Sequence, residues 1–257
     1  MRRVLVIGIG AGDPDHVTVQ AIAALNAAEV FFVMDKGAAK HELVRLRREI
    51  CERYIEDTSY RIVEVRDPQR DRSAPDYAAA VAAWRSARAD VWEDLIAREL
   101  GEDGCGAFLV WGDPALYDST IAVLDEIATR GRVAFEFEVI PGISSVQALA
   151  AAHRVPLNRV GEPIEITTGR RLLERLDDDD DEGDVVVMLD AGTAFDAIED
   201  RDTEIYWGAY VGTEHEILVA GKLCDVAAEI VRLRAEARDR HGWIMDVYLL
   251  RRRSPRE

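Results

Sequence analysis

The chain has 257 residues, 48% of them apolar, and a formal net charge of −17 at pH 7. That length suits one large or two small α/β domains, and the acidity argues against nucleic acid or an anionic membrane as a partner. No apolar run approaches the roughly 18 residues that span a membrane. Three widely spaced cysteines fit neither a disulfide framework nor a zinc site. We therefore expect a cytoplasmic protein with no bound metal.

Short apolar runs alternate with amphipathic stretches in the first half of the chain. Strands are predicted at 4–9, 30–34, 61–65, 106–111 and 133–140, and helices at 14–28, 40–54 and 76–100. Strands that alternate with helices form parallel βαβ units. The sequence therefore predicts an α/β fold whose N-terminal sheet is largely parallel.

The second half of the chain continues with different loops. Strands are predicted at 185–189, 204–211 and 243–250, and the last two alternate in a way that is typical of antiparallel pairing. We therefore expect a mixed C-terminal sheet, with domains at 1–140 and 141–257. The acidic run at 177–182 is predicted to be a solvated loop, because six like charges repel one another.

The first loop, "IGIGAGDPDH" (7–16), places Gly8, Gly10 and Gly12 directly after an apolar strand. The dinucleotide fingerprint GxGxxG needs its third glycine where this chain has Asp13. A carboxylate there would compete with a pyrophosphate for the amides of a helix N-terminus. Asp followed by Pro14 instead predicts a helix cap, so the loop does not favour NAD.

Two later loops resemble this first corner. "WGDPALYDS" (111–119) repeats Gly-Asp-Pro after a strand, with Gly112 and Asp113 in the matching places. "EVIPGISS" (138–145) ends another strand, and we expect Ser144 or Ser145 to cap the helix that runs through His153. Open α/β sheets bind ligands at the carboxyl ends of their strands, so we predict one shared site.

These three loops together resemble those of the tetrapyrrole (corrin and porphyrin) methyltransferase family. "VVVMLDAG" and "YWGAYVGTEHE" resemble its two C-terminal loops, so the resemblance covers nearly the whole chain. It implies two α/β domains with S-adenosylmethionine (SAM) in the cleft between them, and a homodimer. One departure is Ala11, where many relatives have a proline that would stiffen the turn.

The resemblance also implies the chemistry. Among family members, the chain most resembles those that methylate ring carbon C1 of precorrin-5 and release an acetyl group as acetate, leaving S-adenosylhomocysteine (SAH). Asp35 is the predicted proton acceptor, with His41 as a second candidate and with a cap or a bridge to Lys36 as the alternative. The SAM contacts implied by the family match are Ala11, Gly112, Asp113, Leu116, Ser144, Ser145, Met188 and Gly212. Asp113 has a helix cap as its alternative, and Met188 an ordinary core position.

The substrate carries many carboxylates, so an acidic protein needs local positive charge to bind it. The stretch 40–72 holds nine Lys/Arg against eight Asp/Glu and is near neutral. Arginine suits carboxylates because its planar fork pairs with both oxygens. We predict that Lys36, Arg45 and Arg48 bind the substrate. The alternative for the two arginines is an ion pair on the helix surface with the glutamate four residues later, Glu49 or Glu52.

Three functions stay open on the residues alone. A SAM-dependent ring methyltransferase is favoured, for precorrin-5 or another corrin or porphyrin ring. An NAD-dependent oxidoreductase has only the glycine loop and Asp35 in its favour. A non-catalytic tetrapyrrole carrier on the same scaffold is the third.

Overall fold

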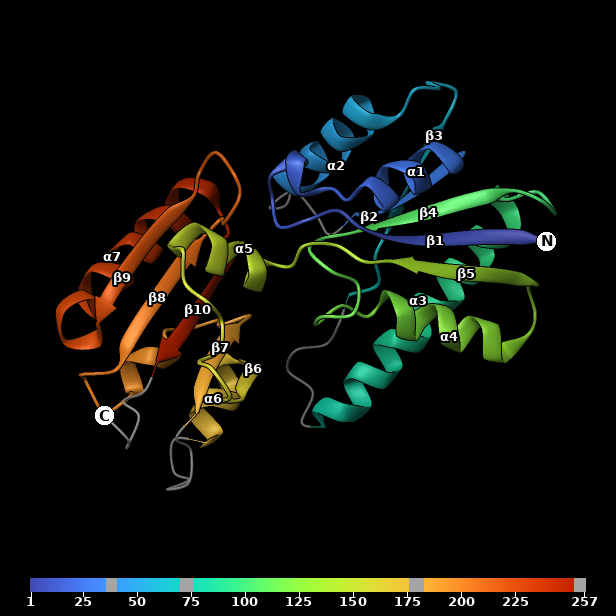
Figure 1. Cartoon of the computed structure of the whole chain (residues 1–257). Coiled ribbons are helices and arrows are strands. Elements are labelled where there is room, and N and C mark those ends of the chain that lie inside the picture. Colours follow the sequence, from blue (N-terminus) through green and yellow to red (C-terminus); the bar gives the residue numbers. More distant parts are fainter. Residues whose placement is uncertain (36–40, 70–75, 176–182, 252–257) are drawn as a thin grey trace. The chain divides into compact units, whose positions relative to one another are not determined.

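The computed structural model describes residues 1–35, 41–69, 76–175 and 183–251 (Figure 1). The chain divides into two compact units, Met1–Ser144 and Ser145–Glu257. The division comes after Ser144, whereas the sequence places it after residue 140. Within the described ranges, no helix is long and apolar enough to cross a membrane.

The first unit is built on a five-stranded parallel sheet with the order β3-β2-β4-β1-β5. Its elements are β1 (Arg2–Gly8), α1 (Val19–Ala27), β2 (Val30–Asp35), α2 (His41–Tyr54), β3 (Arg61–Arg66), α3 (Tyr77–Glu99), β4 (Cys105–Val110), α4 (Thr120–Arg130) and β5 (Phe135–Ile140). The parallel α/β prediction is confirmed for this half of the chain.

Helices cover both faces of this sheet, with α1 and α2 on one side and α3 and α4 on the other (Figure 1). Leu5 and Ile7 of β1 pack toward α1, and Val4 and Val6 pack toward α4. Burial on both faces explains why this strand reads as a continuous apolar run. The neighbours β1 and β4 are followed by helices on opposite faces, so their carboxyl ends form the point where such sheets bind ligands.

The predicted helix over 14–28 is wrong in its first turn. Residues Pro14–His16 form a short 3₁₀ turn (η1), and the side chain of Asp13 accepts a hydrogen bond from the N–H of Asp15 at 2.8 Å. The α1 helix begins later, where the Thr18 hydroxyl accepts from the N–H of Ala21 at 3.0 Å. Asp13 therefore caps a single turn, because Thr18 supplies a second N-cap that restarts the chain as a helix.

The second unit holds a mixed sheet with the order β6-β7-β10-β8-β9, in which β6 and β7 run parallel and the other neighbours antiparallel. Its elements are α5 (Ser145–His153), β6 (Ile164–Thr168), α6 (Gly169–Arg175), β7 (Asp184–Met188), η3 (Ala194–Ala197), β8 (Glu204–Ala209), β9 (Ile217–Lys222), α7 (Leu223–His241) and β10 (Asp246–Arg251). The mixed sheet was predicted, but the half-exposed edge strands β6 and β9 were not. The acidic run at 177–182 lies outside the described residues.

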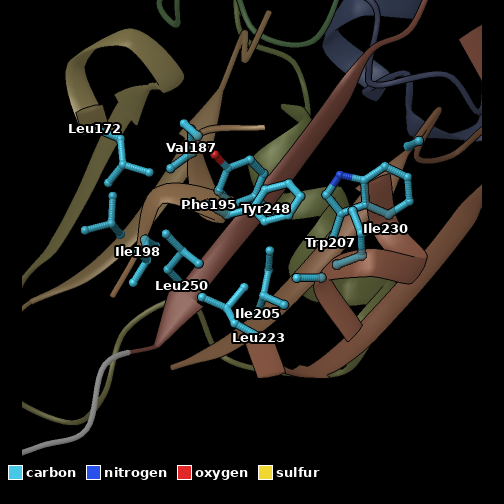
Figure 2. Packing of buried hydrophobic residues seen from close by; sticks show 14 of the residues in the cluster. Leu172, Val187, Phe195, Ile198, Ile205, Trp207, Leu223, Ile230, Tyr248 and Leu250 are labelled. Carbon is cyan, nitrogen blue, oxygen red and sulfur yellow. The ribbon is translucent and has the colours of Figure 1, made fainter. Parts of the chain in front are cut away.

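One face of this second sheet carries the core of the unit. Figure 2 shows Trp207 of β8 and Tyr248 of β10 lying among apolar side chains from η3 and α7, with Phe195 beside Tyr248. The rings of Phe195 and Tyr248 meet edge to face, with centroids 5.4 Å apart. Helix α5 packs on the opposite face, where His153 Nε2 lies 3.0 Å from the Trp207 carbonyl.

A buried polar network ties this core to the loops around it. Asp246 Oδ2 accepts hydrogen bonds from Arg234 Nε at 2.9 Å and from Trp207 Nε1 at 3.1 Å. Burial raises the pKa of the Asp246 carboxyl, and the Arg234 charge acts against that rise. The Tyr248 hydroxyl donates to Asp190 Oδ2 at 2.8 Å. A buried charge is tolerated only when it is paired, so these contacts hold α7, β8 and β10 in one arrangement.

Replacing Arg234 by Met should lower the free energy of unfolding by about 3–5 kcal/mol, because it leaves the Asp246 carboxylate buried without its cation. The matched control is Arg232→Met on the same helix, which removes only an exposed pair with Glu236 and should cost less than about 1 kcal/mol. Urea denaturation of both variants measures the difference. Equal losses of unfolding free energy in the two variants would mean that the buried Asp246 carboxylate does not need the charge of Arg234.

Candidate active site

Two glycine turns meet at the carboxyl ends of β1 and β4. The N–H of Gly112 donates to the carbonyl of Gly10 at 2.8 Å, and the N–H of Gly10 lies 3.4 Å from the carbonyl of Gly112, which makes an isolated antiparallel bridge. Both residues have positive φ, +85° at Gly10 and +69° at Gly112. Left-handed backbone of this kind favours glycine. The hydrogen-bonded bridge between the first and second loops therefore depends on glycine at both positions.

The third loop closes against the same point. A Cβ on Gly8 would lie 2.6 Å from the nitrogen of Gly142 and 2.9 Å from the carbonyl oxygen of Gly112. A Cβ on Gly142 would lie 2.2 Å from that same oxygen. The atoms in the way are backbone atoms, which cannot swing aside as a side chain can. The loop that follows β5 therefore belongs to the first unit, which explains why the division falls beyond residue 140.

Asp113 joins the second loop to the third. Its Oδ1 accepts a hydrogen bond from the N–H of Ala115 at 2.8 Å, and its Oδ2 accepts from the N–H of Gly142 at 2.9 Å. The Gly-Asp-Pro sequence predicts a helix cap here, but the first bond closes only a turn, because α4 begins later, at Thr120. The second bond links two loops that are far apart in the sequence. Asp113 therefore positions both loops, and its contact with a cofactor stays a prediction.

The remaining site residues of the first unit lie on these loops. Ala11 is buried in the first loop, Leu116 is partly buried in the second, and Ser144 is buried at the end of the third. Ser145 begins α5 of the second unit and is partly buried. Tyr117, beside Leu116, has a φ of +53° with a side chain that is 47% exposed. Strained non-glycine backbone gathers at functional sites, and no sequence signal marked this tyrosine.

In the second unit, Met188 and Gly212 lie at the same edge of the sheet. Met188 ends β7 opposite Val247 of β10, and Gly208, near the end of β8, lies opposite the same Val247. Gly212 follows β8 with a φ of +81°, and its N–H donates to Glu216 Oε2 at 2.8 Å. The loops after β7 and β8 therefore start at the same edge of the sheet, on either side of β10.

A buried carboxylate that sequence reasoning missed shapes the loop after Met188. Asp190 accepts hydrogen bonds from the N–H of Gly192 at 3.0 Å and from the N–H of Ala194 at 2.8 Å. The residue before it, Leu189, has a φ of +52° and is 60% exposed. Asp190 thus holds its own loop in a turn that presents an apolar side chain. An aspartate shortly after a strand and two residues before a glycine was the available signal.

The predicted proton acceptor, Asp35, is the last residue of β2. The pairing of β2 with β4 ends at Phe32 opposite Phe108, so the end of β2 has left β4 before Asp35 is reached. The backbone of Asp35 therefore lies at the carboxyl edge of the sheet, where the glycine loops also lie. Its side chain, all of Lys36 and the side chain of His41 lie outside the described residues.

The predicted substrate arginines lie on the exposed side of α2. Arg48 Nη2 donates to Glu64 Oε1 of β3 at 2.8 Å, and both side chains are about half exposed. Arg45 is also exposed. Arg47, between them in sequence, turns toward the sheet and donates from Nε to the carbonyl of Leu109 at 3.2 Å. Helix α2 thus sends one of its three clustered arginines to the edge where the loops meet.

Comparison with known proteins agrees with this architecture. The model of the tetrapyrrole (corrin/porphyrin) methylases matches residues 3–227. A protein from Sinorhizobium sp named precorrin-6A synthase [deacetylating] is 52% identical over 98% of this chain and 96% of its own. A structure from Corynebacterium diphtheriae, described as related to cobalamin synthesis (CobF), is 38% identical with a TM-score of 0.84, covering 98% of this chain and 99% of that one.

A more distant solved structure shares the fold. The uroporphyrin-III C-methyltransferase from Thermus thermophilus, complexed with S-adenosylhomocysteine, is 18% identical with a TM-score of 0.60, and 97% of each chain is covered. The family model spans most of the chain, and the fold agrees with those of the solved relatives. The chain therefore belongs to the tetrapyrrole (corrin/porphyrin) methylase family and is a methyltransferase.

Proposed function

We propose that the protein transfers a methyl group from SAM to ring carbon C1 of precorrin-5 and releases the acetyl group of the ring as acetate, giving precorrin-6A. The observation that carries this proposal is the 52% identity, over 98% of the chain, to a relative named precorrin-6A synthase [deacetylating]. Its alternative is another corrin or porphyrin ring as the methyl acceptor.

The first unit fits SAM better than it fits a dinucleotide. SAM would supply a methyl group on a sulfonium, whose sulfur leaves readily as the neutral thioether of SAH. The carboxylates of Asp13 and Asp113 accept backbone N–H groups within the glycine loops. The first long helix begins only at Val19, so no helix N-terminus follows the first glycines to hold a pyrophosphate. Carboxylates so placed suit a cationic ligand and oppose a phosphate.

The work left to the protein is to align the methyl donor with the ring carbon and to exclude water. For this we propose backbone contacts from the three glycine loops of the first unit and from the loops after β7 and β8 of the second. The residues are Ala11, Gly112, Asp113, Leu116, Ser144, Ser145, Met188 and Gly212. The bridge and the Asp113 hydrogen bonds keep the first three loops in place.

The second half of the reaction needs a base, because water must attack the acetyl carbonyl to release acetate. We propose Asp35 for this role, since it ends β2 at the carboxyl edge of the same sheet that carries the glycine loops. Lys36, Arg45 and Arg48 are the proposed contacts for the substrate's carboxylates. We also expect a cytoplasmic homodimer that uses neither nucleic acid nor a membrane as a partner.

The direct test incubates the protein with SAM and precorrin-5 and reads the product by mass. We expect one methyl group gained, one acetyl group lost and SAH formed. Titration calorimetry should show heat with SAH and none with NAD. Turnover of a different tetrapyrrole would move the assignment within the family, and micromolar NAD binding without SAH binding would refute it.

The Gly112→Ala variant should weaken SAH binding by roughly tenfold or more, because a side chain at this left-handed position strains the bridge that sets the loops. The matched control is Gly131→Ala. Gly131 has a nearly equal φ of +64° at the end of α4, with open space around a Cβ. Both variants should lose similar stability. If calorimetry finds equal SAH affinities for the two, Gly112 has no special place at the cofactor.

The Asp35→Asn variant should separate the two steps. If Asp35 is the base, acetate release should slow by roughly 10²–10⁴, while SAH binding and much of the methyl transfer persist. A methylated product that keeps its acetyl group should then accumulate, and mass spectrometry would detect it. Equal loss of both steps would instead place Asp35 before the methyl transfer, and no change would make it a structural residue.

A further inference from the structure

The arginine that reaches the carboxyl edge of the first sheet fills a gap in the strand pairing. The carbonyl of Val110 accepts from the N–H of Ile9, the residue after β1, so the preceding carbonyl, that of Leu109, points the other way, toward β2. The last β2–β4 pair is Phe32 with Phe108. Arg47 Nε donates to Leu109 O just beyond that pair, at 3.2 Å. The guanidinium therefore lies where β2 and β4 part.

The surroundings of this guanidinium favour an anion. Burial lowers the pKa of Arg47, and the negative charge of Asp118 in the second loop acts in the opposite direction. The carboxylate of Asp118 is itself held in place, because its Oδ1 accepts the N–H of Thr120 at 2.7 Å. A cation withdrawn from water is costly unless negative charge and hydrogen bonds around it compensate the lost hydration. A guanidinium can bind a carbonyl through Nε and hold a carboxylate with its other donors.

A second donor belongs to the same strand end as Leu109, the residue whose carbonyl Arg47 reaches. Trp111 follows β4 two residues after Leu109, immediately before Gly112 of the bridge. Its Nε1 is shielded from solvent and has no acceptor among the residues that the structure describes. A buried donor without a hydrogen-bond partner lowers the stability of the fold by about 1–3 kcal/mol, so such groups are rare outside functional sites. An indole N–H cannot accept, so whatever satisfies it must bring an acceptor oxygen.

We propose that Arg47, assisted by the indole N–H of Trp111, binds a side-chain carboxylate of the tetrapyrrole substrate at the carboxyl edge of the first sheet. The proposal rests on the proposed function for the identity of the substrate class. It adds Arg47 to the predicted arginines and distinguishes it from Arg48, which is exposed and paired with Glu64. Exposed pairs of that kind contribute little, whereas a partly buried guanidinium that meets a carboxylate contributes more.

Steady-state kinetics of Arg47 variants tests the proposal. Arg47→Ala should raise KM for the tetrapyrrole roughly 10- to 100-fold with a smaller change in kcat, and Arg47→Lys should lie between it and wild type. Trp111→Phe should raise KM roughly 2- to 10-fold. SAH affinity by calorimetry should stay within about twofold of wild type in all of them. Arg47→Gln, which can still donate to Leu109 O, covers the case in which the alanine variant folds poorly.

The matched control is Arg61→Ala, an exposed arginine at the start of β3 that pairs with Glu99 and should leave KM unchanged. A binding assay that needs no turnover, quenching of protein fluorescence by the octacarboxylate uroporphyrin III, separates this proposal from the choice of substrate. If the protein does not methylate precorrin-5 but still binds the porphyrin through Arg47, only the proposed function is refuted. Unchanged KM and porphyrin affinity in both Arg47→Ala and Arg47→Gln would overturn the inference, as would a KM effect confined to Arg48→Ala. If the Arg47 variants lose SAH affinity by the same factor by which their KM rises, Arg47 has a structural role and the inference is also overturned.

Discussion

The first unit depends on the absence of three side chains where its loops meet. Gly8, Gly112 and Gly142 bring the backbones after β1, β4 and β5 so close that a Cβ on Gly8 or Gly142 would strike main-chain atoms. Gly10 adds the hydrogen-bonded bridge to Gly112. Because β1 and β4 send their helices to opposite faces, this contact lies where a parallel sheet opens for a ligand. The glycines thus shape the site by packing, beyond any direct contact with a cofactor.

Each unit also holds a loop at the carboxyl end of a strand with an aspartate placed shortly after that strand. Asp113 accepts backbone N–H groups from its own loop and from Gly142. Asp190 accepts two from its own loop and one from the Tyr248 hydroxyl. Both carboxylates therefore use their charge on main-chain donors, which stiffens a loop without secondary structure. Such preorganisation suits a displacement in which geometry, more than acid or base strength, limits the rate.

The charge of the chain acts locally. A protein of net charge −17 would repel a polycarboxylate at long range, yet exposed charges are screened within about 10 Å at ordinary salt. The arginines of α2 differ because their surroundings differ: Arg48 lies in water with Glu64, while Arg47 is partly buried at the edge of the sheet. Residue counts establish that the segment is near neutral, but only the fold shows which arginine reaches the carboxyl end of β4.

The sequence by itself determined the parallel first sheet, the three glycine corners and the family, because apolar runs and Gly-Asp-Pro turns are local patterns. Tertiary structure alone decided that Asp113 reaches Gly142. It also decided which arginine approaches β4. These outcomes depend on which segments meet after folding, and residues 29 or more positions apart share no local signal that a sequence pattern could carry.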